Sequence, residues 1–198
     1  MIFLPVYVDD IVLFTNNEES KSYIKEEQQK KFKIKDLGDI NNCIGIHVER
    51  DRTRGTIYLD QRKYIQEVLN KYEMSDCKTV KTPIDMNAKV QGYLEDAKIM
   101  HDIPYQEIIG CLLYISQITR PDIRFVINML SKYNNKPEMQ HWIALKRIMR
   151  YLKGTQDFRL SYKQNITTMT HAYCDSDWAS SEDDLLHRLY ILVPGRNN

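Results

Sequence analysis

Closely spaced cysteines and long apolar runs are both absent from this sequence. The four cysteines at positions 43, 77, 111 and 174 lie far apart and form no C-x-x-C pair, which argues against a disulfide framework and against a cysteine-rich zinc module. No run approaches the roughly 20 apolar residues of a membrane span. The apolar start at 2–8 is shorter than a signal-peptide core and is followed at once by two aspartates. We therefore expect an intracellular protein that makes no membrane contact.

An excess of charge of one sign is also missing. The chain has 28 basic and 27 acidic residues and a formal net charge of +1. This balance excludes binding to nucleic acid through overall charge. Any such affinity would have to come from a local basic patch.

The hydrophobic pattern changes its period near position 60. Before that point, short β-branched and aromatic runs predict strands, interrupted by one charged helix. Turn-forming pairs such as Asn41-Asn42 separate the runs. The expected strands lie at 2–8, 11–14, 33–37, 43–50 and 56–59, with a hairpin turn at 51–55 between the last two, and the expected helix lies at 19–32.

After position 60, apolar residues recur at helical spacing and predict four helices, so the fold class is α+β. Asp60 can cap the first helix, and a linker is expected at 78–98. A proline falls in the first turn of each of the other three helices, and Gly154 is expected to cap the last one. The positions expected to face inward are Tyr64, Ile65, Val68, Leu69, Tyr72, Ile108, Ile109, Leu112, Leu113, Ile123, Val126, Ile127 and Leu130.

Asp9 and Asp10 lie between two apolar runs, at a break suited to a tight hairpin turn. Two like charges held by buried strands are costly unless cations compensate them, and Mg²⁺ prefers hard oxygen ligands of this kind. Two ions about 4 Å apart could stabilise the attacking and leaving oxygens of a phosphoryl transfer. The bare dipeptide fits a plain polar turn better, so the choice depends on other motifs.

Further short motifs follow this pair in the chain. They are Y-V-D-D at 7–10, F-K-I-K-D-L-G at 32–38, I-G-I at 44–46, L-D-Q-R-K-Y at 59–64, K-T-P at 81–83, Y-Q-E-I-I-G-C-L-L-Y at 105–114, T-R-P-D-I at 119–123, R-Y-L-K-G-T at 150–155 and Y-C-D-S-D-W-A at 173–179. In type, order and spacing they resemble the reverse transcriptases of copia-type retrotransposon Pol polyproteins, followed by the opening of ribonuclease H. One departure is Cys43, which stands where the family usually has an aromatic residue.

The resemblance implies a division of the chain into polymerase subdomains. Palm hairpins would come first, then a mostly helical thumb and connection region, then a truncated ribonuclease H strand. The implied segments are a partial palm at 1–60, a thumb-like helix at 61–77, a linker at 78–100, a helical thumb and connection at 101–160, and a ribonuclease H start at 170–198.

The resemblance also implies roles for single residues. Asp9 and Asp10 would be catalytic carboxylates that bind Mg²⁺, with Asp9 the more direct ligand, and Asp175 would be the first metal ligand of ribonuclease H. The partners would be an RNA template, a DNA primer or RNA–DNA hybrid, and deoxynucleoside triphosphates. The residues that would position primer or template are Tyr7, Gly38 and Gly45.

Two charged groups have two interpretations each. Lys146, Arg147, Arg150 and Lys153 fall on adjacent turns of the last helix, where they could contact a phosphate backbone or form a solvated helix face. Weak alternation at 171–178 predicts a strand, on which Asp175 and its neighbour at 177 would point to the same side. That arrangement suits metal binding and a solvated acidic edge equally well.

The family pattern further predicts an incomplete catalytic set. In the family another catalytic aspartate precedes the Y-x-D-D box, and the family's R-K-S-T match is lost here at 183–190. We therefore expect Asp9 and Asp10 alone not to hold two ions in working geometry, so that the chain is an inactive polymerase remnant. Two alternatives stay open: a domesticated module that binds nucleic acid through the basic helix, and a reading frame that is never translated.

Overall fold

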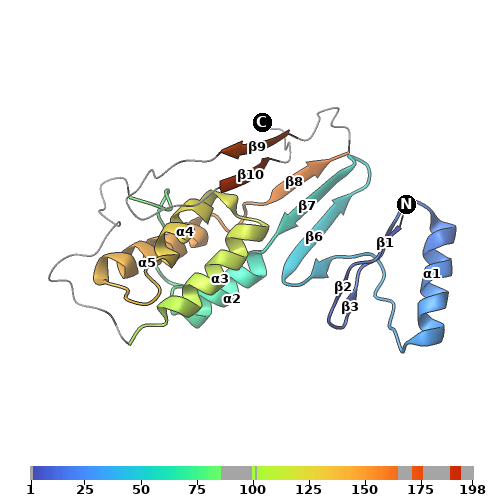
Figure 1. Cartoon of the computed structure of the whole chain (residues 1–198), viewed down its shortest axis with the longest axis horizontal. Coiled ribbons are helices and arrows are strands. Elements are labelled where there is room, and N and C mark those ends of the chain that lie inside the picture. Colours follow the sequence, from blue (N-terminus) through green and yellow to red (C-terminus); the bar gives the residue numbers. More distant parts are fainter. Residues whose placement is uncertain (1, 86–99, 101, 165–170, 176–187, 193–198) are drawn as a thin grey trace. The chain divides into compact units, whose positions relative to one another are not determined.

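The computed structural model describes residues 2–85, 100, 102–164, 171–175 and 188–192, the last two ranges by their backbone alone. Figure 1 shows the helices and strands of the chain. They fall into two compact units, the first made of Met1–Val48 with Leu59–Arg159 and the second of Glu49–Tyr58 with Leu160–Asn198. The mixture of helices and antiparallel strands agrees with the predicted α+β class.

Four very short strands open the chain. β1 (Ile2–Phe3) pairs antiparallel with β4 (Phe14–Thr15), and β2 (Val6–Tyr7) pairs antiparallel with β3 (Asp10–Ile11). The predicted strands at 2–8 and 11–14 are therefore present, but each is broken in two. The first break contains Pro5, which has no N–H to contribute to a ladder; its carbonyl accepts from the amide of Val12 at 3.0 Å.

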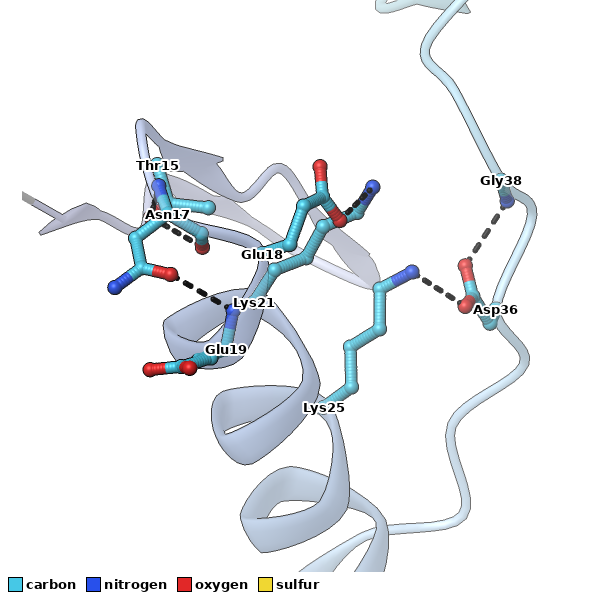
Figure 2. Close-up of polar contacts among 8 residues, drawn as sticks. All are labelled: Thr15, Asn17, Glu18, Glu19, Lys21, Lys25, Asp36 and Gly38. Atoms are coloured by element: carbon cyan, nitrogen blue, oxygen red, sulfur yellow. Dashed lines mark hydrogen bonds and ion pairs between the residues drawn. The ribbon is translucent and has the colours of Figure 1, made fainter.

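Helix α1 (Glu18–Lys31) is held mainly by local interactions. The side chain of Asn17 accepts a hydrogen bond from the Glu19 amide at 2.9 Å, which caps the first turn (Figure 2). Acidic residues in the first turn and basic residues in the last complement the helix dipole. No residue of α1 is buried, so the helix gains almost nothing from core packing.

The predicted strand at 33–37 is wrong. This segment has no ladder partner and runs as irregular chain. Lys25 of α1 pairs with the Asp36 carboxylate at 2.6 Å, and the same carboxylate accepts from the Gly38 amide at 2.9 Å (Figure 2). These hydrogen bonds, with the Lys25 bond first, lower the pKa of Asp36. Side-chain contacts thus replace the strand ladder that periodicity predicted.

A four-stranded sheet follows, with strand order β5-β6-β7-β8. Its strands are β5 (Asn42–Cys43), β6 (Ile46–Asp51), β7 (Thr56–Asp60) and β8 (Leu160–Lys163). The predicted strand at 43–50 is interrupted by a turn at 44–45, and the hairpin expected between 51 and 56 is present. The fourth strand was not predicted.

The helical part of the first unit contains the core. It consists of α2 (Arg62–Lys71), α3 (Tyr105–Ile118), the 3-10 turn Pro121–Ile123, α4 (Arg124–Ser131) and α5 (Met139–Gly154). Fully burying one Leu or Ile contributes about 1.5–3 kcal/mol, and the buried apolar side chains of the described residues lie in this region, so it supplies most of their hydrophobic stabilisation. The predicted inward positions are confirmed except for Tyr64, Tyr72 and Leu113, which are half-buried.

Two predicted helix ends differ in detail. Gln61 precedes α2 as its cap residue, while the Asp60 carboxylate accepts from the Arg62 amide at 3.2 Å. Gly154 is the last residue of α5 rather than a left-handed cap beyond it. A Cβ on Gly154 would lie 3.1 Å from the Cβ of Thr79, so the missing side chain serves close packing.

In the second unit, β9 (His171–Asp175) pairs antiparallel with β10 (Arg188–Leu192). The register places Asp175 opposite Arg188. A strand starting at 171 was predicted and is confirmed, whereas β10 was not predicted. Position 177 lies outside the described residues, so the predicted pairing of two carboxylates on one face stays a prediction.

Candidate functional site

The hairpin of β2 and β3, residues 6–11, carries Asp9 and Asp10 and is called the acidic hairpin. Its turn lies one residue earlier than the sequence predicts. Val6 is paired with Ile11 and Tyr7 with Asp10, so the turn consists of Val8 and Asp9. Val8 has a φ of 51°, while Asp9 is not in the left-handed region. That pattern fits a type II′ turn, in which Gly normally occupies the first position. A β-branched residue there is a genuine conformational outlier.

This hairpin is exposed, so the prediction that buried strands hold the two carboxylates is wrong. Val6 is 62% exposed, Tyr7 59% and Val8 81%. The cause is topological: β2 and β3 form a sheet of two strands, and such a sheet has too little neighbouring surface to bury its side chains. The repulsion between Asp9 and Asp10 is therefore screened by water in this chain.

Asp9 and Asp10 have the donor chemistry that Mg²⁺ prefers, two adjacent carboxylates. Within the described residues, no three His, Cys, Asp or Glu side chains come together as a possible metal site. Mg²⁺ in polymerases and kinases often takes one or two carboxylates and completes its shell with substrate phosphates and water. The pair therefore fits the ion only with oxygens from another source. The side chain of Asp175 lies outside the described residues.

The three predicted positioning residues occupy different surroundings. Tyr7 is on β2, beside the turn. Gly38 has a φ of 81° with no atom within 4 Å of a Cβ placed there, so it stands in an open loop. Gly45 has a φ of 70°, and a Cβ placed there would lie 3.7 Å from the hydroxyl oxygen of Tyr114 on α3.

Tyr114 was missed by sequence reasoning as a site residue. Its hydroxyl donates a hydrogen bond to the carbonyl oxygen of Ile44. Burial raises the pKa of Tyr114, and the nearby Tyr7 and Cys43 raise it further. The available signal was a tyrosine hydroxyl directly after the mostly apolar run at 108–113, but nothing in the spacing shows which loop it would meet.

The basic side chains of α5 contact a neighbouring segment of the same chain. That segment, residues 77–85, is called the strap. Lys153 Nζ donates to the Cys77 carbonyl at 2.7 Å, and Arg150 Nε donates to the Lys78 carbonyl at 2.6 Å. The first part of the predicted linker therefore lies along α5.

Arg147 extends the same contact. Its Nη2 donates to the Thr82 hydroxyl at 3.0 Å, and its Nη1 lies 3.5 Å from the Asp85 carboxylate. Lys146 differs: its Nζ lies over the Trp142 ring, 4.8 Å from the centroid. The structure thus gives three of the four basic side chains a structural contact, and the predicted nucleic-acid role of the set stays a prediction.

Within the described residues, no helix is both long enough and apolar enough to cross a membrane.

Comparison with known proteins gives a consistent set of matches. Residues 1–86 match the family model "Reverse transcriptase (RNA-dependent DNA polymerase)". The chain is 35% identical over 184 residues to the retrovirus-related Pol polyprotein from transposon RE2 of Arabidopsis thaliana, covering 93% of this chain and 12% of that protein. It is 32% identical over 188 residues to the Pol polyprotein from transposon TNT 1-94 of Nicotiana tabacum, covering 92% of this chain and 14% of that protein.

A shorter relative matches along most of its own length. An uncharacterized mitochondrial protein of Arabidopsis thaliana is 32% identical over 178 residues, which is 90% of this chain and 72% of the relative. The chain therefore spans only a small part of the Pol polyproteins but most of this protein. No solved structure matches the chain.

Proposed function

Because this chain belongs to the reverse transcriptase family of copia-type retrotransposon Pol polyproteins, we propose that it is a segment of an RNA-directed DNA polymerase in which Asp9 and Asp10 are catalytic carboxylates. The parent reaction is attack of a primer 3′-hydroxyl on the α-phosphate of a deoxynucleoside triphosphate, directed by an RNA template. Two Mg²⁺ ions would neutralise charge on the phosphates.

The acidic hairpin is the observation that supports this proposal. Its turn holds Val8 in a conformation that costs roughly 1–3 kcal/mol and persists where a site requires it. A plain polar turn would relieve the strain with Gly or Asn. The conformation places Asp9 at the exposed turn and Asp10 opposite Tyr7, so both carboxylates and the tyrosine are accessible to a nucleotide and a primer end.

The chain's own residues would act by binding and orientation. Asp9 and Asp10 would hold the ions, with Asp9 the more direct ligand. Tyr7 would orient the primer end or template, and the segment from Gly38 to Gly45 would contact the primer strand. Asp175 would serve ribonuclease H as its first metal ligand. The palm, thumb, connection and ribonuclease H segments would then follow one another along the chain.

We further propose that the isolated chain does not synthesise DNA. The hairpin that bears the carboxylates is exposed and belongs to a two-stranded sheet. Neighbouring structure is needed to hold catalytic groups within about 0.5 Å of working geometry. The two carboxylates also lack a third acidic partner among the described residues.

A purely nucleic-acid-binding role through α5 is less well supported. Arg147, Arg150 and Lys153 already donate hydrogen bonds to the strap, so these groups are less available to bind phosphate. Lys146 is the exposed member of the set. One exposed lysine supplies too little charge for a phosphate-binding surface, because affinity grows with the number of phosphates neutralised.

Metal binding in the presence of nucleotide tests the proposal. With Mn²⁺ and a deoxynucleoside triphosphate added to the full chain, paramagnetic broadening should be strongest at the amides of 7–11. The variants Asp9→Asn and Asp10→Asn should each reduce it severalfold, and Asp76→Asn should not. Broadening that centres elsewhere, or that survives both substitutions, would contradict the assignment.

A further inference from the structure

The turn at 44–45 is strained, and a helix residue contacts it. Cys43 pairs with Ile46 across a two-residue connection, in which Ile44 has a φ of 50° and Gly45 a φ of 70°. Positive φ at both positions is typical of a type I′ turn, where Asn-Gly is preferred. Ile44 is β-branched and disfavours this conformation. Such a residue keeps it only when its surroundings hold it there.

Tyr114 is the neighbouring residue that holds the turn in this conformation. Its hydroxyl donates to the Ile44 carbonyl oxygen. A Cβ on Gly45 would lie 3.7 Å from the Tyr114 hydroxyl oxygen and 4.0 Å from Cε1 of its ring, so the Tyr114 side chain lies beside Gly45. Tyr114 is therefore next to both residues of the turn.

The Tyr114 side chain is itself fixed. Its ring meets the ring of Tyr64 on α2 edge to face, with centroids 5.3 Å apart and planes at 85°. The next residue on α3, Ile115, is fully buried in the helical core. A rotation of the Tyr114 side chain would therefore break packing with α2, and the hydroxyl occupies one defined place.

Tyr114 also lies near the acidic hairpin. After burial, the proximity of Tyr7 is the next cause that raises the pKa of Tyr114.

We propose that Tyr114 is a positioning residue: its hydroxyl and ring hold the strained Ile44-Gly45 turn against the helical core and thereby fix where this turn meets the primer strand. The first step, that Tyr114 holds the turn, depends on the contacts alone. The second step, that the turn meets the primer strand, rests on the proposed function, since only that function assigns the turn to the primer. The two steps can be tested separately on the full chain.

Hydrogen exchange measured by mass spectrometry tests the first step. Tyr114→Phe keeps the ring against Tyr64 and removes the bond to Ile44. Exchange in a peptide covering 42–47 should become roughly fivefold faster, the factor that corresponds to the net value of one typical hydrogen bond. Exchange within α4 and α5 should stay unchanged. Unchanged exchange at 42–47 would overturn the proposal.

Tyr105→Phe is the matched control. Tyr105 lies on the same helix, and its buried hydroxyl donates to the Leu130 carbonyl at 3.0 Å. Its loss should lower overall stability without singling out 42–47. If Tyr105→Phe accelerates exchange at 42–47 as much as Tyr114→Phe does, Tyr114 acts only through general stability and the proposal fails.

A second variant tests the strain. Ile44→Asn allows positive φ more readily, so exchange at 42–47, corrected for intrinsic exchange rates, should be slower than in the unaltered chain. Tyr114→Phe should still accelerate exchange in the Ile44→Asn background, because the Tyr114 hydroxyl bonds to a backbone carbonyl that this substitution keeps. Exchange that is unchanged or faster in Ile44→Asn would contradict the strain argument.

Binding of a fluorescently labelled DNA primer annealed to an RNA template tests the second step. Measured by anisotropy at a temperature where all variants are folded, Tyr114→Phe should weaken binding severalfold and Tyr105→Phe should leave it unchanged. If exchange responds but binding does not, the turn is held by Tyr114 but does not position the primer. If the unaltered chain binds no duplex, the primer role fails together with that part of the proposed function, while the exchange result still decides the first step.

Discussion

Arg120 donates two hydrogen bonds to the carboxylate of Asp122, from Nε to Oδ1 at 3.0 Å and from Nη2 to Oδ2 at 2.7 Å, while its own side chain is only 1% exposed. The guanidinium also donates to the carbonyl and the hydroxyl of Thr155, at 3.1 and 2.7 Å, and lies 5.3 Å from the Tyr151 ring centroid. The T-R-P-D-I motif therefore joins the start of α4 to the end of α5, which is a structural role.

Loss of the Asp122 charge should destabilise this junction strongly. Asp122→Asn leaves the buried Arg120 guanidinium without its counter-charge. Because the Asp122 side chain is itself 34% exposed, the expected cost is about 1–3 kcal/mol, below that of breaking a fully buried pair. Urea unfolding followed by circular dichroism should show a lower midpoint at an unchanged m-value. Asp157→Asn is the control, because Asp157 is 87% exposed in its ion pair with Arg62 and surface pairs contribute little. Equal losses in the two variants would contradict a special role for Arg120.

The pH dependence of stability should contain a contribution from the same carboxylate. Burial alone would raise the pKa of Asp122, but the hydrogen bonds from Arg120 and Tyr151 outweigh it and the net pKa is lowered. A lowered folded-state pKa stabilises the protein above the unfolded value of about 3.9. That stabilisation is lost as the pH falls through the folded pKa. The thermal midpoint should therefore fall below about pH 4 more steeply in the unaltered chain than in Asp122→Asn. A thermal midpoint that falls more steeply in Asp122→Asn than in the unaltered chain would contradict a lowered pKa for Asp122.

Substitution by alanine should change the stability of the chain differently at two helical glycines, Gly110 and Gly154. Gly110 lies within α3, and a Cβ there would meet no atom within 4 Å. Gly110→Ala should stabilise the chain by about 0.5–1 kcal/mol through helix propensity alone. Gly154→Ala should gain less or lose stability, since its Cβ would lie 3.1 Å from Thr79 in the strap. Chemical denaturation of both variants measures the difference in the free energy of unfolding. An equal gain in stability would mean that the strap moves to accommodate the new methyl group without cost.

Tryptic cleavage should report whether α5 holds the strap. Arg150→Gln removes the hydrogen bond to the Lys78 carbonyl and should accelerate cleavage after Lys78 and Lys81 by roughly fivefold. Lys146→Gln should leave cleavage there unchanged, because Lys146 lies over Trp142 rather than on the strap. If both substitutions act alike, the basic face stabilises the strap only through its overall charge.

Sequence reasoning located the helical core well, for a clear physical reason. The inward faces of α3 and α4 follow from residues such as Ile108, Ile109 and Ile127, whose helical spacing allows one side to be buried. Such spacing is local, so no knowledge of distant neighbours is required. The N-cap at Asn17 and the charge pattern of α1 are local in the same way, although the cap residue was not singled out in advance.

The strands and the site depended on distant partners. The segment 33–37 has a strand-forming composition, but it is held by a hydrogen bond from Lys25 of α1 to Asp36 instead of by a neighbouring strand. The hairpin around Asp9 has an apolar sequence but is exposed, because burial depends on which other strands join the sheet. The contact of Tyr114 with Ile44 joins residues 70 positions apart. No periodicity encodes such a pairing.

Primer extension by a chimera is the most direct test of the assignment of Asp9 and Asp10 to polymerase catalysis. Residues 1–86 of this chain would replace the matching segment of an active full-length Pol polyprotein, with Asp76→Asn as the control. We predict template-directed DNA synthesis in Mg²⁺ that is lost in both Asp9→Asn and Asp10→Asn and retained in the control. Synthesis that persists in either aspartate variant would contradict the assignment.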